Sequence, residues 1–283
     1  MSSVNSIGVL GAGQMGRGIA QVAIMSGYEV FLYDAFPESL DKGFSFIESQ
    51  LKRGVEKGKW SSDVTGEALG RLKVNKTLEE LKNCDLIVEA ATENKEIKFK
   101  LFQECDQLIK REAILVSNTS SISITEIAAQ TERPQQVAGM HFMNPVPVMK
   151  LVEGIRGLET SNETFETVAS VAETMGKVFI KANDVPGFAV NRILMPMINE
   201  AVYALYEGVA SVEDIDNAMK LGTNQPMGPL QLADFIGLDT CLAIMEVLHD
   251  GLGDTKYRPC PLLKKYVAAR RFGKKSGRGF YEY

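Results

Sequence analysis

The feature that most constrains the fold is a glycine-rich turn near the start of the chain. The apolar segment 7–10 leads into the spacing Gly-x-Gly-x-x-Gly at 11–16, and a helical pattern of apolar residues follows. A second apolar segment, 30–33, ends at the acid Asp34. A strand, a tight turn, a helix and a second strand that ends in an acid are typical of the βαβ unit that binds a dinucleotide.

Each position of this turn has a physical role in such a unit. Gly11 permits the sharp turn, Gly13 lets a pyrophosphate approach the backbone, and Gly16 lets the helix pack close to the strand. Gln14 and Met15 open the helix, whose unpaired N–H groups and positive dipole end attract phosphate. We therefore expect these five residues to bind a dinucleotide. The alternative is a structural βα turn without a ligand.

The acid after the second strand indicates which dinucleotide is bound. The carboxylate of Asp34 can accept hydrogen bonds from both ribose hydroxyls, and it would repel a 2′-phosphate. The expected cofactor is therefore NAD, in preference to NADP.

Composition and charge exclude several kinds of partner. The chain has 283 residues, of which 45% are hydrophobic and 24% charged, as in a globular protein with one large or two medium domains. Its net charge of −5 makes nucleic acid and an anionic membrane unfavourable partners. An acidic small molecule would need a local basic patch.

Targeting signals and metal-binding spacings are not recognised in the sequence. No apolar segment approaches the length of a membrane span, and the first residues lead directly into the first expected strand. The two histidines and the scattered cysteines form no metal-ligand spacing. We therefore expect no metal, free thiols and a cytoplasmic location. The cysteines are Cys84, Cys105, Cys241 and Cys260.

The order of patterns along the chain predicts two domains. Short apolar segments first alternate with helical patterns, which is typical of a doubly wound, mostly parallel α/β sheet of the Rossmann type. Beyond a turn cluster at 183–187 only helical patterns remain. We predict a dinucleotide-binding domain over 1–184 and an all-α domain over 185–283. Within the first, we expect strands at 72–74, 85–89, 114–117, 137–142 and 150–155, and helices at 37–58, 96–110 and 122–129.

The second domain is expected to contain long apolar helices. The segment 188–206 is apolar nearly all round and contains Pro196, which should kink it. Helices are also expected at 211–221, where Ser211 is a candidate cap, and at 228–248. A domain this apolar predicts a dimer interface, and hence a homodimer or a higher homo-oligomer.

His141 and Glu153 are the candidate acid–base pair. His141 lies near the end of one expected strand and Glu153 lies in the next, with a proline-rich loop between them. Strand ends are where α/β sheets place ligands, and a carboxylate beside the ring would stabilise the imidazolium. Such a pair suits a general base that takes a proton from an alcohol. The alternative is a histidine with a structural role.

Small polar residues follow another expected strand end. Asn118 and Ser120 are candidates to bind a carbonyl oxygen or the nicotinamide, whereas Ser121 or Ser123 would cap the next helix. Helix capping alone would also explain these residues. Asn191 is a polar residue in an apolar helix, and its spacing does not distinguish a site residue from a buried amide bonded to the backbone.

Together the motifs amount to a family resemblance. Five segments occur in order along the whole chain, at 11–16, 118–121, 141–147, 184–192 and 272–281. They resemble the L-3-hydroxyacyl-CoA dehydrogenase family, and within it the bacterial 3-hydroxybutyryl-CoA dehydrogenases. The resemblance implies an NAD-dependent oxidoreductase.

The resemblance also implies roles for individual residues. It implies that His141 is the general acid and base, that Glu153 is its partner, and that Ser120 contacts the 3-oxygen of the substrate. Asn144 and Asn191 would line the same pocket.

Further positions match the cofactor contacts of the family. Glu93 and Lys98 match positions near the nicotinamide ribose, and Lys275 matches one that reaches toward the cofactor. Asn118 and Asn144 are expected to contribute to the same cofactor site.

Coenzyme A would place several phosphate charges on a protein of net negative charge. Arg53 and Lys57 are four residues apart in an expected helix and share one face. The family places acyl-CoA contacts on this helix, and Lys57 falls on a matching position. The alternative is a solvated basic face.

The expected reaction is the interconversion of a short-chain L-3-hydroxyacyl-CoA and its 3-oxoacyl-CoA, with acetoacetyl-CoA as the expected substrate, by a free-standing enzyme. Two other hypotheses remain open. One is a related dehydrogenase that acts on a free 3-hydroxy acid and does not need Arg53 and Lys57. The other is a dinucleotide-binding protein with a structural role and no activity.

Overall fold

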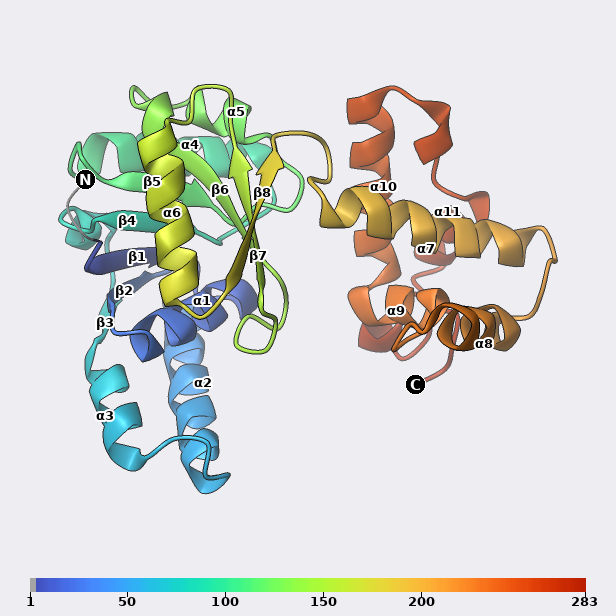
Figure 1. Cartoon of the computed structure of the whole chain (residues 1–283), viewed down its shortest axis with the longest axis horizontal. Coiled ribbons are helices and arrows are strands. Elements are labelled where there is room, and N and C mark those ends of the chain that lie inside the picture. The colour runs from blue at the N-terminus through green and yellow to red at the C-terminus, as the bar shows by residue number, and fades with distance from the viewer. Residues whose placement is uncertain (1–3) are drawn as a thin grey trace. The chain divides into compact units, whose positions relative to one another are not determined.

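The computed structural model describes residues 4–283, which form two compact units (Figure 1). The first unit ends at Val185 and the second begins at Pro186. Each unit has its own hydrophobic core.

The first unit is built on one eight-stranded sheet with the order β3-β2-β1-β4-β5-β6-β7-β8. All neighbouring strands are parallel except the antiparallel pair β6 and β7. The strand order reverses between β1 and β4, which is the switch point where doubly wound sheets bind ligands. The strands are β1 (Ser6–Leu10), β2 (Glu29–Tyr33), β3 (Leu72–Asn75), β4 (Leu86–Glu89), β5 (Ile114–Ser117), β6 (Val137–Phe142), β7 (Leu151–Arg156) and β8 (Val178–Asn183).

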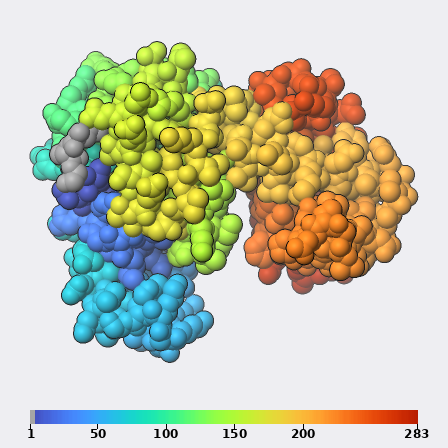
Figure 2. Space-filling model, in the orientation of Figure 1, coloured from blue at the N-terminus to red at the C-terminus, as the bar shows by residue number. Residues whose placement is uncertain are grey.

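Helices connect these strands and cover the sheet. The central strands β4 and β5 are buried along their whole length, as expected for parallel strands covered on both faces. In Figure 1, α3 and the second half of α2 project beyond the sheet, and in Figure 2 the same residues form the light-blue lobe at the lower end of the first unit. The helices are α1 (Gln14–Met25), α2 (Pro37–Glu56), α3 (Ser62–Gly70), α4 (Lys95–Leu108), α5 (Ile124–Ala128) and α6 (Asn162–Thr174), with short 3-10 turns at Leu78–Leu81 and Pro134–Gln136.

The sequence patterns predict seven of the eight strands of this unit but omit two of its helices and one edge strand. Every expected strand is present to within one or two residues. The helices α3 and α6 and the edge strand β8 were not predicted. The side chains of β8 are exposed or half-buried along its length, so the strand has no strong apolar pattern. Tertiary pairing with β7 decides its conformation.

The second unit is helical throughout and contains no strand longer than isolated bridges within 186–283. Ser211 caps α8 as expected, because its hydroxyl accepts a hydrogen bond from the Asp214 N–H. The prediction of one helix over 228–248 is wrong. The chain breaks at Gly237, where φ is +108°, a value that favours glycine. The helices are α7 (Val190–Tyr206), which contains Pro196, α8 (Val212–Thr223), α9 (Pro229–Ile236), α10 (Leu238–Leu252) and α11 (Pro261–Ala268), with 3-10 turns at Thr255–Tyr257 and Lys274–Ser276.

Candidate active site

The glycine-rich turn joins β1 to α1 with the geometry that its spacing predicts. Gly11 has a φ of +98°, which favours glycine. A Cβ added to Gly16 would lie 1.8 Å from the Gly11 carbonyl oxygen, so only glycine permits this close packing. A Cβ on Gly13 would meet no atom of the described residues within 4 Å. The backbone at Gly13 is therefore open to a ligand.

Asp34 lies just beyond β2 and faces the same turn. One carboxylate oxygen accepts a hydrogen bond from the Ala12 N–H at 2.7 Å, and the other accepts one from the Phe36 N–H at 2.9 Å. These bonds hold the carboxylate beside the start of α1. The open backbone, the helix N-terminus and this fixed acid fit the phosphates and the ribose of NAD.

His141 and Glu153 face each other across the antiparallel strands β6 and β7. The His141 Nδ1 and Glu153 Oε2 atoms are 2.8 Å apart, and both side chains are buried. The expected approach of these two side chains is confirmed, and the cross-strand register is its cause. A buried carboxylate in this position fixes the orientation of the imidazole ring.

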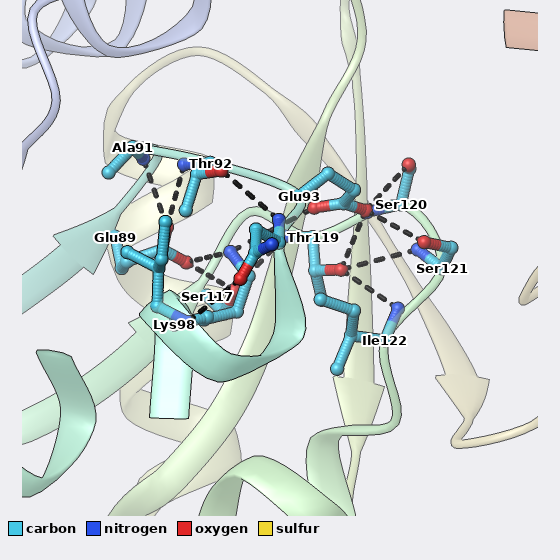
Figure 3. Close-up of polar contacts among 12 residues, drawn as sticks. Glu89, Ala91, Thr92, Glu93, Lys98, Ser117, Thr119, Ser120, Ser121 and Ile122 are labelled. Carbon is cyan, nitrogen blue, oxygen red and sulfur yellow. Dashed lines mark hydrogen bonds and ion pairs between the residues drawn. The ribbon is translucent and has the colours of Figure 1, made fainter. Parts of the chain in front are cut away.

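A buried ion pair lies at the ends of β4 and β5 (Figure 3). Lys98 is 1% exposed and Glu89 is 0% exposed, and the Lys98 ammonium contacts Glu89 Oε2 directly. The Ser117 hydroxyl also donates to Glu89 Oε2, at 2.6 Å, and the Ala91 N–H donates to Oε1 at 2.9 Å. A buried charge pair needs such additional hydrogen bonds to offset its desolvation.

Glu93 links this ion pair to the loop after β5. Its Oε2 lies 3.9 Å from the Lys98 ammonium. Its Oε1 accepts hydrogen bonds from the Thr119 and Ser120 hydroxyls at 2.8 and 2.9 Å, and from the Ser121 hydroxyl at 2.9 Å (Figure 3). The loops that carry the candidate cofactor and substrate residues are therefore joined to each other.

The other polar residues after β5 have distinct positions. The Asn118 side-chain oxygen accepts a hydrogen bond from the Phe142 N–H at 2.8 Å, which ties the end of β5 to the end of β6. Ser123 caps α5, because its hydroxyl accepts from the Glu126 N–H. Asn144 is exposed in the loop that follows β6.

The remaining candidate residues lie elsewhere in the two units. Arg53 and Lys57 are exposed at the C-terminal end of α2. Asn191 is buried in the first turn of α7, and Lys275 forms an ion pair with Asp239 at 2.6 Å. Asn191 and Lys275 belong to the second unit.

Sequence reasoning did not identify Glu89 and Ser117 as members of the site. A signal was present, because Glu89 ends a continuous apolar strand and a buried acid needs a partner. The identity of that partner depends on how α4 packs, and the sequence does not state it.

The described residues contain no group of three metal-ligating side chains, and no helix among them is long and apolar enough to cross a membrane. Each of the four cysteines is a buried free thiol. Burial raises the pKa of Cys84 to about 12 and also raises that of Cys260. These thiols are poor nucleophiles at neutral pH.

The fold and the site define a class of protein: an oxidoreductase with a Rossmann-type NAD-binding domain, followed by a helical domain. The chain belongs to the 3-hydroxyacyl-CoA dehydrogenase family. The NAD binding domain of this family matches residues 6–185, and its C-terminal domain matches residues 187–283.

Relatives match over nearly the whole chain. A probable 3-hydroxybutyryl-CoA dehydrogenase of Bacillus subtilis is 58% identical over 280 residues, which cover 99% of this chain and 98% of the relative. The 3-hydroxybutyryl-CoA dehydrogenase of Bradyrhizobium diazoefficiens is 54% identical, with coverage of 99% and 96%. The crystal structure of (S)-3-hydroxybutyryl-CoA dehydrogenase from Ralstonia eutropha superposes with a TM-score of 0.97 at 48% identity, with 99% of each chain covered.

Proposed function

We propose that this protein catalyses the NAD-dependent interconversion of L-3-hydroxybutyryl-CoA and acetoacetyl-CoA. The observation that carries the proposal is the buried His141–Glu153 pair, in the same domain as an open dinucleotide-binding turn. Two relatives named as 3-hydroxybutyryl-CoA dehydrogenases, one of them as probable, share more than half of their residues with the chain.

The residues supply proton transfer and binding. Bound NAD would accept the hydride that leaves C3 of the alcohol. His141 takes the hydroxyl proton through Nε2, because Nδ1 is held by Glu153. Glu153 stabilises the imidazolium that results. General acid–base catalysis of this kind contributes about a hundred- to ten-thousand-fold in rate.

Ser120 is proposed to contact the 3-oxygen of the substrate. Its hydroxyl donates to Glu93 in the structure, so Glu93 holds the serine loop in place. We assign Glu93 and Lys98 to the side of the nicotinamide ribose, and Asn118 and Asn144 to the neighbouring part of the site. The assignments of Asn191 and Lys275 rest on the family resemblance.

Asp34 is proposed to select NAD. Its two oxygens accept backbone hydrogen bonds, so the carboxylate cannot turn away to admit a 2′-phosphate without breaking them. Arg53 and Lys57 are proposed to bind the phosphates of coenzyme A, because no ion pair within residues 4–283 uses either cation.

The protein is further proposed to be a cytoplasmic homodimer or a higher homo-oligomer. The helical unit exposes large apolar side chains that a second copy of the chain would cover, including Ile193, Val209, Leu221 and Phe235. Light scattering coupled to size-exclusion chromatography tests the assembly, and a monomer at micromolar concentration would contradict it.

The test of function is NADH oxidation followed by absorbance with acetoacetyl-CoA or with free acetoacetate. We expect turnover with acetoacetyl-CoA and very slow turnover with the free acid. Comparable rates with both substrates would favour the free-acid dehydrogenase. Binding of NADH without turnover of either substrate would favour a structural role.

A further inference from the structure

Arg17 lies between the dinucleotide-binding turn and helix α2. It belongs to the first turn of α1, where its N–H donates to the Gly13 carbonyl oxygen at 3.0 Å. Its guanidinium carbon lies 3.9 Å from the centre of the Phe46 ring on α2. A ring in this position fixes the plane of the guanidinium and stabilises its charge.

No acidic side chain of the described residues neutralises Arg17. Its guanidinium forms no ion pair and no side-chain hydrogen bond within residues 4–283, and its Nε atom is buried without a partner. A buried N–H donor without an acceptor is costly, so most such groups are paired. The unpaired donor and the uncompensated charge together point to an anionic ligand.

Phe46 places this cation at one end of a basic stripe on α2. Phe46, Gln50, Arg53 and Lys57 recur at intervals of three and four residues and therefore share one face of the helix. The same helix is pressed against the cofactor turn, since a Cβ on Gly43 would lie 2.9 Å from the Ala12 carbonyl oxygen. A positive stripe thus runs from the cofactor turn along the helix.

We propose that Arg17 is a third phosphate-binding residue for the coenzyme A moiety, acting with Arg53 and Lys57. This inference rests on the proposed function and extends its substrate site. A guanidinium presents paired donors that match a phosphate, and the net charge of −5 makes local cations necessary for a ligand of this charge. Stacking on Phe46 directs Arg17 toward the α2 stripe. The pyrophosphate of the dinucleotide is bound by the backbone N–H groups of the turn, so it does not need Arg17.

The experiment measures dissociation constants by calorimetry for coenzyme A, for dephospho-coenzyme A and for NADH. In R17A we expect the dissociation constant of coenzyme A to rise by about ten-fold or more, with that of NADH changed by less than about two-fold. R17K should lose less, because it keeps the charge. F46L should show a smaller rise, since it removes the ring that orients the guanidinium.

The matched control is K52A. Lys52 is exposed on the same helix and is also unpaired among the described residues, but it lies off the stripe. Its removal changes the net charge as R17A does and should leave the affinity for coenzyme A within about two-fold. If dephospho-coenzyme A binds R17A and wild type equally, Arg17 contacts the 3′-phosphate. If R17A weakens the binding of dephospho-coenzyme A as much as it weakens the binding of coenzyme A, Arg17 contacts the pyrophosphate.

Three outcomes would overturn the inference. If R17A binds coenzyme A with unchanged affinity and the wild type turns over acetoacetyl-CoA normally, Arg17 does not belong to the coenzyme A site. The proposed function then stays intact. Weakened NADH binding would assign Arg17 to the cofactor pyrophosphate instead. Failure of the wild type to bind coenzyme A would overturn this inference and the proposed function together. Should R17A not fold, as judged by circular dichroism, R17Q and R17K carry the comparison.

Discussion

Two glycines of the cofactor turn should fail in different ways when replaced by alanine. In G16A the new Cβ would lie 1.8 Å from the Gly11 carbonyl oxygen, far below the 3.0 Å that real contacts respect. The start of α1 would have to move by about 1 Å, at a cost of roughly 2–3 kcal/mol in the free energy of unfolding. Such a loss lowers the melting temperature by about 5–10 °C.

In G13A the new Cβ meets no described atom within 4 Å, so the fold should keep nearly all of its stability. The methyl group would instead occupy space over the turn that a pyrophosphate needs. Loss of one charge-assisted hydrogen bond to that group weakens NADH binding by about ten- to a hundred-fold. G13A is therefore expected to be stable but defective in binding.

Calorimetric unfolding and NADH titration by fluorescence separate the two effects. G66A serves as the control, because its Cβ also enters open space but lies on α3, away from the turn. G66A should leave the NADH affinity unchanged and should change the free energy of unfolding by no more than about 1 kcal/mol. Wild-type NADH affinity in G13A, or wild-type stability in G16A, would refute this reasoning about the turn.

Four further outcomes are expected. H141N should keep its NADH affinity, as measured by titration, and lose about a hundred- to ten-thousand-fold in kcat; activity within a few-fold of wild type would remove the histidine from the mechanism. D34S combined with A35R should narrow the preference for NADH over NADPH in steady-state assays, and a wild type that prefers NADPH would contradict the role of Asp34. Removal of Arg53 and Lys57 together should raise KM for acetoacetyl-CoA with little change in kcat, whereas a phosphate-free pantetheine substrate should be unaffected. Although burial opposes ionisation of Asp85, hydrogen bonds from Lys110 and from backbone N–H groups bring its pKa down to about 2. A depressed native pKa stabilises the fold above the unfolded value near 4, and this stability, about 1 kcal/mol after screening, is lost as the pH falls from about 4 to 2. In D85N the free energy of unfolding should therefore depend less on pH in that window than in the wild type. Equal pH dependence in the two proteins would argue against this role of Asp85.

Local sequence patterns were sufficient for the parts of this protein whose contacts are close in the chain. The turn at 11–16 depends on sterics within one βα unit, so glycine spacing alone predicts it. The pairing of His141 with Glu153 was also predictable, because a short loop joins two adjacent strands and leaves few registers. The family resemblance then supplied roles for these residues.

Contacts between distant segments were decided only by the tertiary structure. The carboxylate of Glu89 meets Lys98 and Ser117 because β4, β5 and α4 pack together, and no local periodicity encodes that meeting. The same holds for Arg17 and Phe46, which depend on the packing of α1 against α2.

The errors of element prediction have the same physical origin. β8 has side chains exposed or half-buried along its length, so its conformation comes from backbone pairing with β7, which a pattern of apolar residues does not report. The break at Gly237 lies within a continuous apolar pattern, and packing of α9 and α10 in the helical core determines where the chain turns. Sequence thus determined the local conformations and the chemistry available, while long-range packing determined which side chains share a site, because burial energies depend on neighbours that the chain brings together only on folding.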